Sequence, residues 1–398
     1  MKNYRSVWVF FVLVGVFTLS IGAGLSSAEV GVTDTTIKIG NIQDTTGLIA
    51  GYGIPRVEAV KTLVKHYNDQ GGINGRKIIL LHESDDYKPS KTVVAFKKLV
   101  EVDKVFCFSA SLGISNVMAL LPEIDRKKIP FLFIGGTSTA LYYPPRRYIF
   151  GIWATYSQYQ QTLLNYVAKD LKMPNAKIAF LHQESESGRD SKRGFYKGVA
   201  KYPGMKVVED IEFKRSTIDY SGIIYRARKA NPDIVQLATI FPQTAAMAKE
   251  MKKTGWKPII LADSSSCDGA LMKLGGDAVE DTILLNTRAM LFEDLPGVNE
   301  YKRLSKKYNP NSKLNPSSYG ASGWVEMLIT LEAIKRAGRN LTREGLINTL
   351  EAFRDVEFGG WVPPVTFGPD KHLGNDTTKV IQVKNGKFVK LADWRSPK

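Results

Sequence analysis

The chain has 398 residues, of which 43% are hydrophobic and 24% charged, and its formal net charge is +16. This composition is that of a globular protein and excludes an intrinsically disordered chain, while the length favours two domains. A basic charge is compatible with nucleic-acid binding, but the basic residues are scattered in pairs such as Lys97-Lys98 and Lys127-Lys128. Since no nucleic-acid-binding motif accompanies them, we expect no nucleic-acid partner.

Residues 1–28 are predicted to be a secretory signal peptide. Lys2 and Arg5 precede a long apolar stretch, and the segment ends in the small residues Ser26-Ser27-Ala28, which suit cleavage after Ala28. A membrane anchor is the alternative, because the apolar stretch is long enough to span a bilayer. The lack of a charged flank after it favours cleavage, so we expect an exported protein.

Apolar strands and helices alternate in the part of the chain that follows. We predict strands at 36–42, 77–84, 104–110 and 129–135, and helices at 52–70, 90–103 and 114–128. The pattern then restarts with strands at 177–184, 205–213, 233–240 and 257–264 and helices at 188–201, 220–230, 244–254 and 267–274. Two further helices, at 318–337 and 342–353, precede a hairpin at 378–391 that turns at Asn385-Gly386. The repeated pattern predicts an α/β fold of two Rossmann-like lobes with largely parallel sheets.

The loop Gly135-Gly136-Thr137-Ser138-Thr139 leaves one of the apolar strands, a position where phosphate loops and catalytic loops occur. It lacks the lysine of a P-loop, and no G-x-G-x-x-G follows the first strand. Ser111 and Ser115 have no G-x-S-x-G around them and no histidine placed to act as a base. We therefore expect no enzyme activity and no cofactor; an exported hydrolase that uses Ser115 remains the alternative.

Metal binding and disulfide formation also have little support. The four histidines show no metal-ligand spacing, so we expect no metal site. Cys107 and Cys267 lie in different parts of the chain, and we expect both to be buried free thiols.

Ligand binding is better supported, because ligands of open parallel sheets lie beyond the carboxyl ends of the strands. Backbone N–H groups and hydroxyls in the Gly135–Thr139 loop and in residues 109–116 can hold a carboxylate without a basic residue. Each loop alone is better explained by turn and capping chemistry, but two of them on adjacent strands favour a cleft. We expect aromatic side chains at the same strand ends to line it, namely Tyr52, Trp153, Tyr156 and Phe241.

These segments resemble the periplasmic solute-binding proteins of ABC transporters, in the branched-chain amino acid (Leu/Ile/Val-binding) class. The stretch from "IKIGNIQDTTGLIAGYG" through "NDQGGINGRKIILLHESDD" is similar to the opening of that family, and "IPFLFIGGTSTAL" is similar to its second ligand loop. "SSYGASGWVEMLITLEAIKRAG" and "VIQVKNGKFV" resemble its closing helix and hairpin. The resemblance covers nearly all of residues 30–395.

The resemblance implies a type I periplasmic binding fold with two lobes, a three-stranded hinge and a ligand in the cleft between the lobes. Lobe 1 would comprise 29–153 with 288–365, and lobe 2 would comprise 154–287 with 366–398. It also implies a small-molecule ligand, ABC permease subunits as partners and a periplasmic location, and we expect a monomer. Sensing for a membrane receptor by the same fold is the alternative function. The ligand contacts carried over by the resemblance, together with the aromatic residues above, are Tyr52, Gly113, Ser115, Gly136, Thr137, Trp153, Tyr156, Ser187, Phe241 and Ser264.

Two departures from the family pattern affect the expected ligand. Ser264 stands where amino-acid binders usually have an acid for the ligand ammonium, and Asp263 is its neighbour. The segment Phe150-Gly151-Ile152 replaces a family F-R-T segment, and aromatic residues follow it. The ligand is therefore expected to be a small carboxylate, with two alternatives left open: a branched-chain or aromatic amino acid, or an aromatic or aliphatic acid without an amine.

Overall fold

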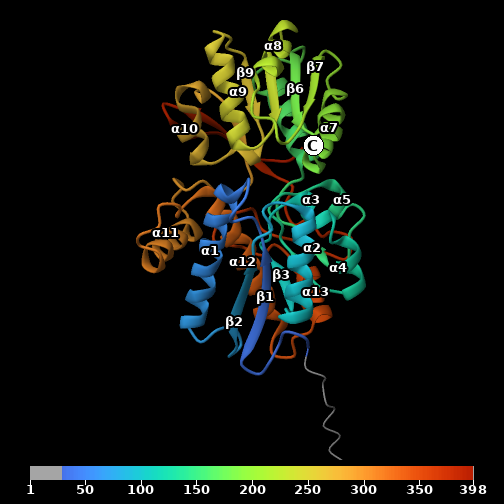
Figure 1. The fold of residues 1–398 in the computed structure, drawn as a ribbon, viewed down its shortest axis with the longest axis vertical. Coiled ribbons are helices and arrows are strands. Elements are labelled where there is room, and N and C mark those ends of the chain that lie inside the picture. The colour runs from blue at the N-terminus through green and yellow to red at the C-terminus, as the bar shows by residue number, and fades with distance from the viewer. Residues whose placement is uncertain (1–28, 398) are drawn as a thin grey trace, which may run out of the picture.

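The alternating strands and helices form two separate sheets in the computed structural model, which describes residues 29–397 (Figure 1). The predicted signal peptide lies outside the described residues. Each sheet is covered by helices, and the two resulting lobes are stacked along the long axis of the molecule. The two-lobed α/β fold predicted from the sequence is confirmed.

The first lobe contains a parallel sheet with the spatial order β2 (Lys77–Glu83), β1 (Thr36–Ile42), β3 (Cys107–Ser109), β4 (Phe131–Leu132) and β5 (Ile149–Phe150). Its helices from the first part of the chain are α1 (Ala50–Asp69), α2 (Pro89–Lys97) with a π-helical continuation (Lys98–Val102), α3 (Ile114–Met118), α4 (Leu121–Lys127) and α5 (Thr139–Tyr142). The later helices α11 (Pro296–Tyr308), α12 (Ser318–Ala337) and α13 (Arg343–Glu351) return to this lobe. Its core includes a stack of Phe96, Phe108 and Phe131, with ring centroids 5.1 and 5.0 Å apart.

The second lobe contains a sheet with the order β12 (Lys387–Arg395), β11 (Thr378–Lys384), β10 (Ile283–Asn286), β9 (Ile259–Ala262), β8 (Ile234–Ala238), β6 (Lys177–Gln183) and β7 (Lys206–Phe213). Strand β11 is antiparallel to both of its neighbours, β10 and β12, and forms the C-terminal hairpin with β12. The other strand pairs are parallel. Its helices are α6 (Tyr156–Lys169), α7 (Glu186–Val199), α8 (Ser221–Lys229), α9 (Phe241–Lys253) and α10 (Gly269–Gly275), with 3₁₀ turns at Ser264–Ser266 and Gly276–Val279.

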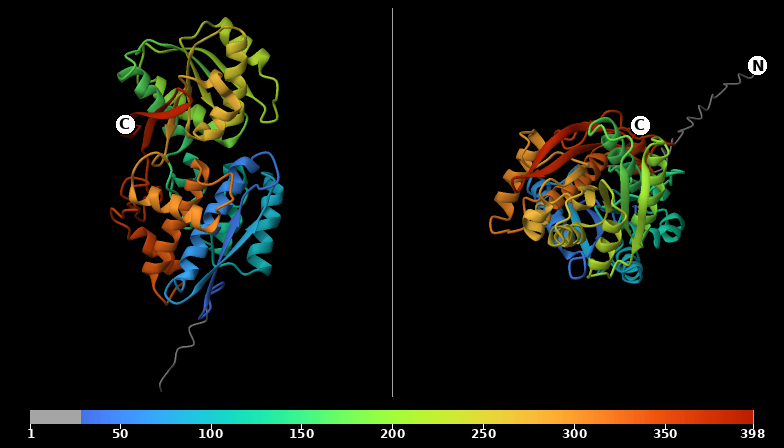
Figure 2. Two further views of the ribbon diagram at one scale, coloured as in Figure 1. Left: turned by 90° about the vertical axis from the view of Figure 1, so that its left-hand side faces the viewer. Right: turned by 90° about the horizontal axis from the view of Figure 1, so that it is seen from above.

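The chain passes between the lobes three times, after β5, after β10 and before β11. Figure 2 shows these connections from the side, together with the C-terminal hairpin at the edge of the second lobe. Because the chain crosses at the ends of strands, the loops that follow the strands of both sheets face one another across the junction.

Some elements differ from those predicted. The single helix expected at 114–128 is two helices, because Pro122 lies in the first turn of α4 and starts a new helix there. Helix α6 and strand β10 were not predicted at all. The N-terminus of α6 has a capping box in which Thr155 accepts from the N–H of Gln158 and the Gln158 side chain accepts from the N–H of Thr155.

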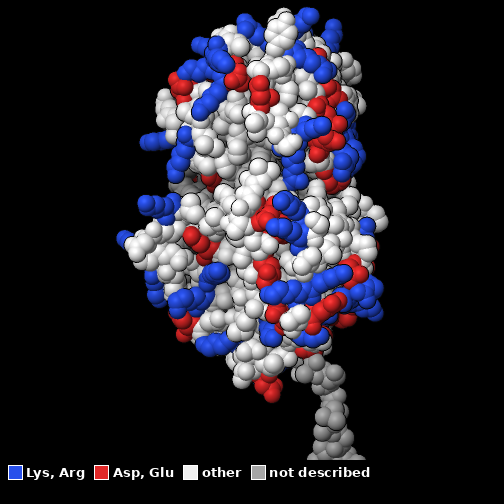
Figure 3. Space-filling view, in the orientation of Figure 1, with Lys and Arg blue, Asp and Glu red and all other residues white. Residues whose placement is uncertain are grey.

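Charges of both signs are distributed over the surface. In Figure 3, Lys and Arg alternate with Asp and Glu on both lobes, and no single large basic patch covers the visible face. Among residues 29–397, no helix combines the length and the apolar character that crossing a membrane requires. The two cysteines are free and buried, as predicted, and each belongs to the core of a different lobe.

Candidate functional site

A cavity lies between the lobes at the carboxyl ends of the strands and encloses about 680 Å³ of space, including its opening to solvent. Both lobes contribute to its wall, mostly through the loops that follow the strands. The lining residues are Ile49, Tyr52, Arg56, Tyr87, Leu112, Gly113, Ile114, Gly135, Gly136, Trp153, Tyr156, Tyr159, Ile240, Ser264, Ser265, Thr287, Arg288, Tyr319 and Ser322. The wall is therefore rich in tyrosine and apolar side chains, with a few polar groups.

Two glycine loops of the first lobe form one side of the cavity. Gly113 donates its N–H to the carbonyl of Gly135 at 3.1 Å, which ties the loop after β3 to the loop after β4. Gly113 and Gly136 have φ angles of +112° and +101°, a region that favours glycine. A Cβ atom on Gly136 would lie 2.9 Å from the hydroxyl of Tyr156. A larger residue at position 136 would therefore intrude on the cavity.

Six of the residues predicted from the sequence line the cavity together: Tyr52, Gly113, Gly136, Trp153, Tyr156 and Ser264. The other four, Ser115, Thr137, Ser187 and Phe241, are not part of its wall.

Three of those four residues have other contacts. The hydroxyl of Thr137 donates to the carbonyl of Ala154 at 2.5 Å, and the hydroxyl of Ser187 lies 2.8 Å from that of Ser185. Phe241 stacks on Tyr52 with ring centroids 4.7 Å apart and donates its backbone N–H to the Tyr52 hydroxyl at 3.0 Å. Phe241 thus supports a cavity residue from behind.

Tyrosines of the first lobe contact the second lobe across the cavity. The hydroxyls of Tyr52 and Tyr319 both donate to the carbonyl oxygen of Ser265, at 2.9 and 2.6 Å. Burial raises the pKa of both hydroxyls well above the usual value near 10, so both remain protonated donors at neutral pH. These bonds hold the two walls of the cavity together.

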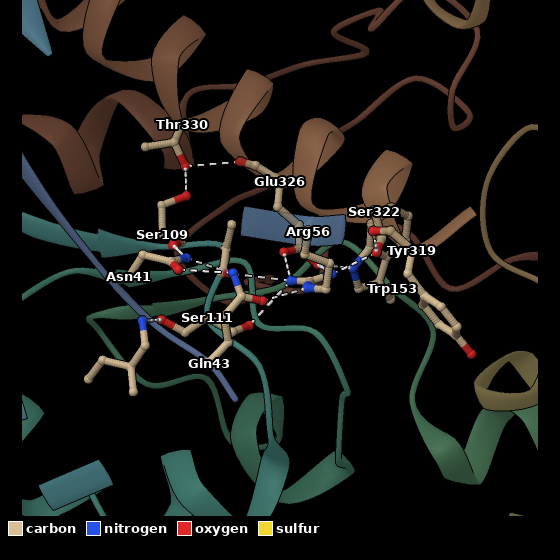
Figure 4. A network of polar contacts seen from close by, with 12 residues as sticks. Asn41, Gln43, Arg56, Ser109, Ser111, Trp153, Tyr319, Ser322, Glu326 and Thr330 are labelled. Atoms are coloured by element: carbon tan, nitrogen blue, oxygen red, sulfur yellow. Dashed lines mark hydrogen bonds and ion pairs between the residues drawn. The ribbon is translucent and has the colours of Figure 1, made fainter. Parts of the chain in front are cut away.

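A buried ion pair joins the wall of the first lobe to the core behind it (Figure 4). The guanidinium of Arg56 on α1 contacts the carboxylate of Glu326 on α12 at 2.5 Å, and both side chains are almost fully buried. Trp153 donates its ring N–H to the same carboxylate at 2.6 Å, and Arg56 donates further to Gln43 and Ser322. Because removing one partner of a buried pair costs about 3–5 kcal/mol, this network fixes the positions of Arg56 and Trp153.

Asp263 is buried beneath the wall and is not part of the lining. Its carboxylate accepts the N–H of Ser265 at 2.8 Å and the side-chain amide of Gln160 at 3.4 Å. Burial raises the pKa of Asp263 to about 7. Ser264, rather than its acidic neighbour, faces the cavity.

Several lining residues were not predicted from the sequence, including Arg56, Tyr87, Tyr159, Arg288 and Tyr319. Arg288 was missed because strand β10 was missed, although the apolar run "ILLN" before it is a usable strand signal. Arg56 lies inside α1 and Tyr319 in the first turn of α12, and the packing of these two helices brings both residues to the cavity.

The described residues offer little for catalysis or metal binding. No group of three or more His, Cys, Asp or Glu side chains among residues 29–397 could hold a metal ion. The charged residues in the cavity wall are Arg56 and Arg288, and neither is a nucleophile or a general base at neutral pH. The arrangement is suited to holding a small molecule by hydrogen bonds, aromatic contacts and positive charge.

Comparisons with known proteins agree with this architecture. A sequence profile described as periplasmic binding protein matches residues 36–387. A Leu/Ile/Val-binding protein homolog 8 from Brucella suis is 21% identical over 391 residues, which cover 93% of this chain and 94% of the relative.

Solved structures share the fold over nearly the whole chain. A branched-chain amino acid ABC transporter protein from Thermus thermophilus with bound valine has a TM-score of 0.85 and 23% identity, covering 92% of this chain and 97% of the other. A fatty acid ABC transporter substrate-binding protein from Thermomonospora curvata has a TM-score of 0.83 and 24% identity, covering 92% and 94%.

Proposed function

Because this chain belongs to the periplasmic binding protein family, we propose that it captures a small carboxylate between its lobes and delivers it to the permease subunits of an ABC importer. The observation that carries the proposal is the cavity itself, which both lobes line at the carboxyl ends of their strands. Among residues 29–397, the charged residues of the wall are two arginines, so its chemistry favours an anion over a cation.

The proposed ligand contacts are the predicted residues that line the cavity, together with the residues found around them. On the first lobe these include Tyr52 and the loops at Gly113 and Gly136, and on the second lobe Tyr156 and Ser264. Carboxylates are also the ligands suggested by the neighbours, since one holds valine and another is a fatty acid transporter protein. Those two ligands differ in whether an amine accompanies the carboxylate.

Ligand binding would act by stabilising the closed arrangement of the lobes, because a ligand that contacts both lobes binds that arrangement better. We propose lobe boundaries at 153/154 and 287/288, which fall in two of the connections between the sheets. For the third we propose a boundary after Leu373 instead of the expected 365/366, because Phe367 and Leu373 pack in the core of the first lobe. We further propose a monomer that is exported to the periplasm and cleaved after Ala28.

Thermal unfolding with and without ligand tests this function. We expect at least one acid from a panel of amino acids and organic acids to raise Tm by about 5 °C or more. A ligand at a hundred times its Kd stabilises by about 2.7 kcal/mol, and each kcal/mol moves Tm by about 2–4 °C in domains of moderate size. If no compound of the panel shifts Tm, the proposed function is wrong.

A matched pair of glycine variants shows whether the shift comes from this cavity. Gly136→Ala places a methyl group 2.9 Å from the Tyr156 hydroxyl and should remove the ligand-induced shift. Gly71→Ala has nearly the same backbone strain, with a φ of +100°, but its Cβ meets no atom within 4 Å. The shift should survive in Gly71→Ala, and its survival in Gly136→Ala would place the ligand elsewhere.

A further inference from the structure

Arg288 is a buried cation in the cavity wall, two residues after the end of β10. Its side chain donates to the carbonyl of Ser318 at 2.9 Å, the hydroxyl of Ser318 at 2.5 Å and the hydroxyl of Thr287 at 3.4 Å. All three acceptors are neutral, and the residue is 3% exposed. A guanidinium has five N–H donors, so some of them remain available to a ligand after these three bonds are formed.

No carboxylate within residues 29–397 forms an ion pair with Arg288, whereas Arg56 is neutralised by Glu326. The nearby acid Asp268 directs its carboxylate to the backbone N–H groups of Ala270 and Tyr319, at 2.9 and 3.3 Å. Asp268 is also outside the cavity wall. A buried charge without a partner is costly, and a ligand anion would compensate it.

The rest of the wall formed by the described residues offers no carboxylate to an ammonium group. Asp, Glu, Lys and His are absent from the cavity lining formed by the described residues. The hydroxyl of Ser264 lies 3.5 Å from that of Thr287, so Ser264 adjoins the loop that carries Arg288. A ligand cation placed beside Ser264 would therefore have no carboxylate in the wall to pair with.

Aromatic rings form much of the remaining wall. Tyr52, Tyr87, Tyr156, Tyr159 and Tyr319 line the cavity together with Trp153. Flat aromatic ligands pack well between such rings.

We propose that the ligand is an aromatic carboxylate without an ammonium group and that its carboxylate pairs with Arg288. This inference rests on the ligand-binding function proposed above. Arginine binds a carboxylate through two parallel charge-assisted hydrogen bonds, which are stronger than the neutral bonds of the glycine loops. The loops at Gly113 and Gly136 then contact the uncharged part of the ligand.

The first test compares three compounds of nearly equal shape by calorimetry, using the exported chain freed of bound ligand by unfolding and refolding. We expect 3-phenylpropanoate to bind at least about tenfold tighter than 3-phenylpropanamide, which lacks the charge, and than phenylalanine, which adds the amine. Binding of phenylalanine as tight as that of 3-phenylpropanoate would overturn the inference and leave the proposed function intact. If neither acids nor amino acids bind, the proposed function fails as well.

The second test asks whether Arg288 supplies the charge. Arg288→Gln should weaken 3-phenylpropanoate at least about tenfold and leave 3-phenylpropanamide unchanged, while Arg288→Lys should keep part of the preference for the acid. The matched control is Arg343→Gln, which alters a largely buried arginine that donates to the backbone carbonyls of Phe106 and Val105, away from the cavity. If Arg288→Gln weakens the affinity for the acid and the amide equally, Arg288 has only a structural role, through its bonds to Ser318. If the variants do not fold, the affinities of the unaltered protein for the three compounds still decide whether the ligand is a carboxylate without an amine.

Discussion

At the scale of single residues, the cavity region holds buried ionisable groups whose charges are compensated to different degrees. Arg56 has a carboxylate partner, Arg288 has only neutral acceptors, and Asp263 has two hydrogen-bond donors but no cation. Burial without a counter-charge favours the neutral form of an acid. Ionisation of Asp263 therefore lowers the free energy of unfolding, and the extent of this loss depends on pH.

We expect the stability of the protein to reflect the titration of Asp263. Burial raises its pKa to about 7, whereas an unfolded aspartate titrates near about 3.9. The folded state holds this proton more tightly, so its contribution to the free energy of unfolding falls as pH rises from about 4 to about 7. Asp263→Asn removes that decline, and urea unfolding should show the variant gaining stability relative to the unaltered protein as pH rises over this range.

The exposed Asp370 provides a control for the Asp263 prediction. Asp370→Asn removes an exposed carboxylate and should change stability by the same amount at both ends of the pH range. A pH-independent difference for Asp263→Asn would mean that its carboxyl does not titrate in this range.

At the scale of elements, close packing of α6 against α7 depends on a glycine. A Cβ atom on Gly194 of α7 would lie 2.1 Å from the carbonyl oxygen of Ser157 on α6. Because a backbone atom is in the way, we expect Gly194→Ala to force the helices apart and to destabilise the protein by about 1–3 kcal/mol in urea unfolding.

Gly222 of α8 is the matched control for this packing effect. Its Cβ would meet no atom within 4 Å, so Gly222→Ala should leave stability unchanged or raise it by up to about 1 kcal/mol through helix propensity. Equal effects of the two substitutions would contradict the packing argument.

How well the elements could be predicted depended on where their apolar residues lie. Strand β1 and helix α12 were predicted with the bounds that the structure has, because their apolar patterns are clear. Helix α6 was missed because it buries polar residues, including Gln160 and Gln161, which hide the apolar periodicity. Its capping box at Thr155 was the available signal.

The candidate site was predictable only where it depends on strand ends. The loops at Gly113 and Gly136 follow predicted strands, and the structure brings both to the cavity. The pairing of Arg56 with Glu326 joins residues 270 positions apart, so no local pattern predicts which arginine lacks an ion-pair partner. Only the folded arrangement distinguishes Arg56 from Arg288.

At the scale of the whole molecule, a contact between the lobes at the cavity wall should contribute to affinity. The guanidinium of Arg215, which follows β7, lies 3.6 Å from the ring centroid of Tyr87, which follows β2. A cation–π contact of this kind is worth about 0.5–1 kcal/mol or more when shielded from water. Contacts that form only between closed lobes increase the population that binds ligand tightly.

We therefore expect Arg215→Ala to weaken ligand binding by about two- to fivefold, mainly through faster dissociation. Stopped-flow measurement of ligand release would show this change. Arg226→Ala removes an arginine that pairs with Glu209 inside the second lobe and should leave the release rate unchanged. An unchanged rate in Arg215→Ala would exclude this contact from the closing equilibrium.

The two buried cysteines have a consequence for how the chain matures. Cys107 and Cys267 belong to the cores of different lobes, and burial raises the pKa of each thiol to about 12. Maturation to this fold therefore needs no oxidation step and no disulfide isomerase. Since a thiolate is the reactive form, each cysteine stays unreactive until its own lobe unfolds. Labelling of Cys107 by a thiol reagent would therefore report unfolding of the first lobe, and labelling of Cys267 unfolding of the second.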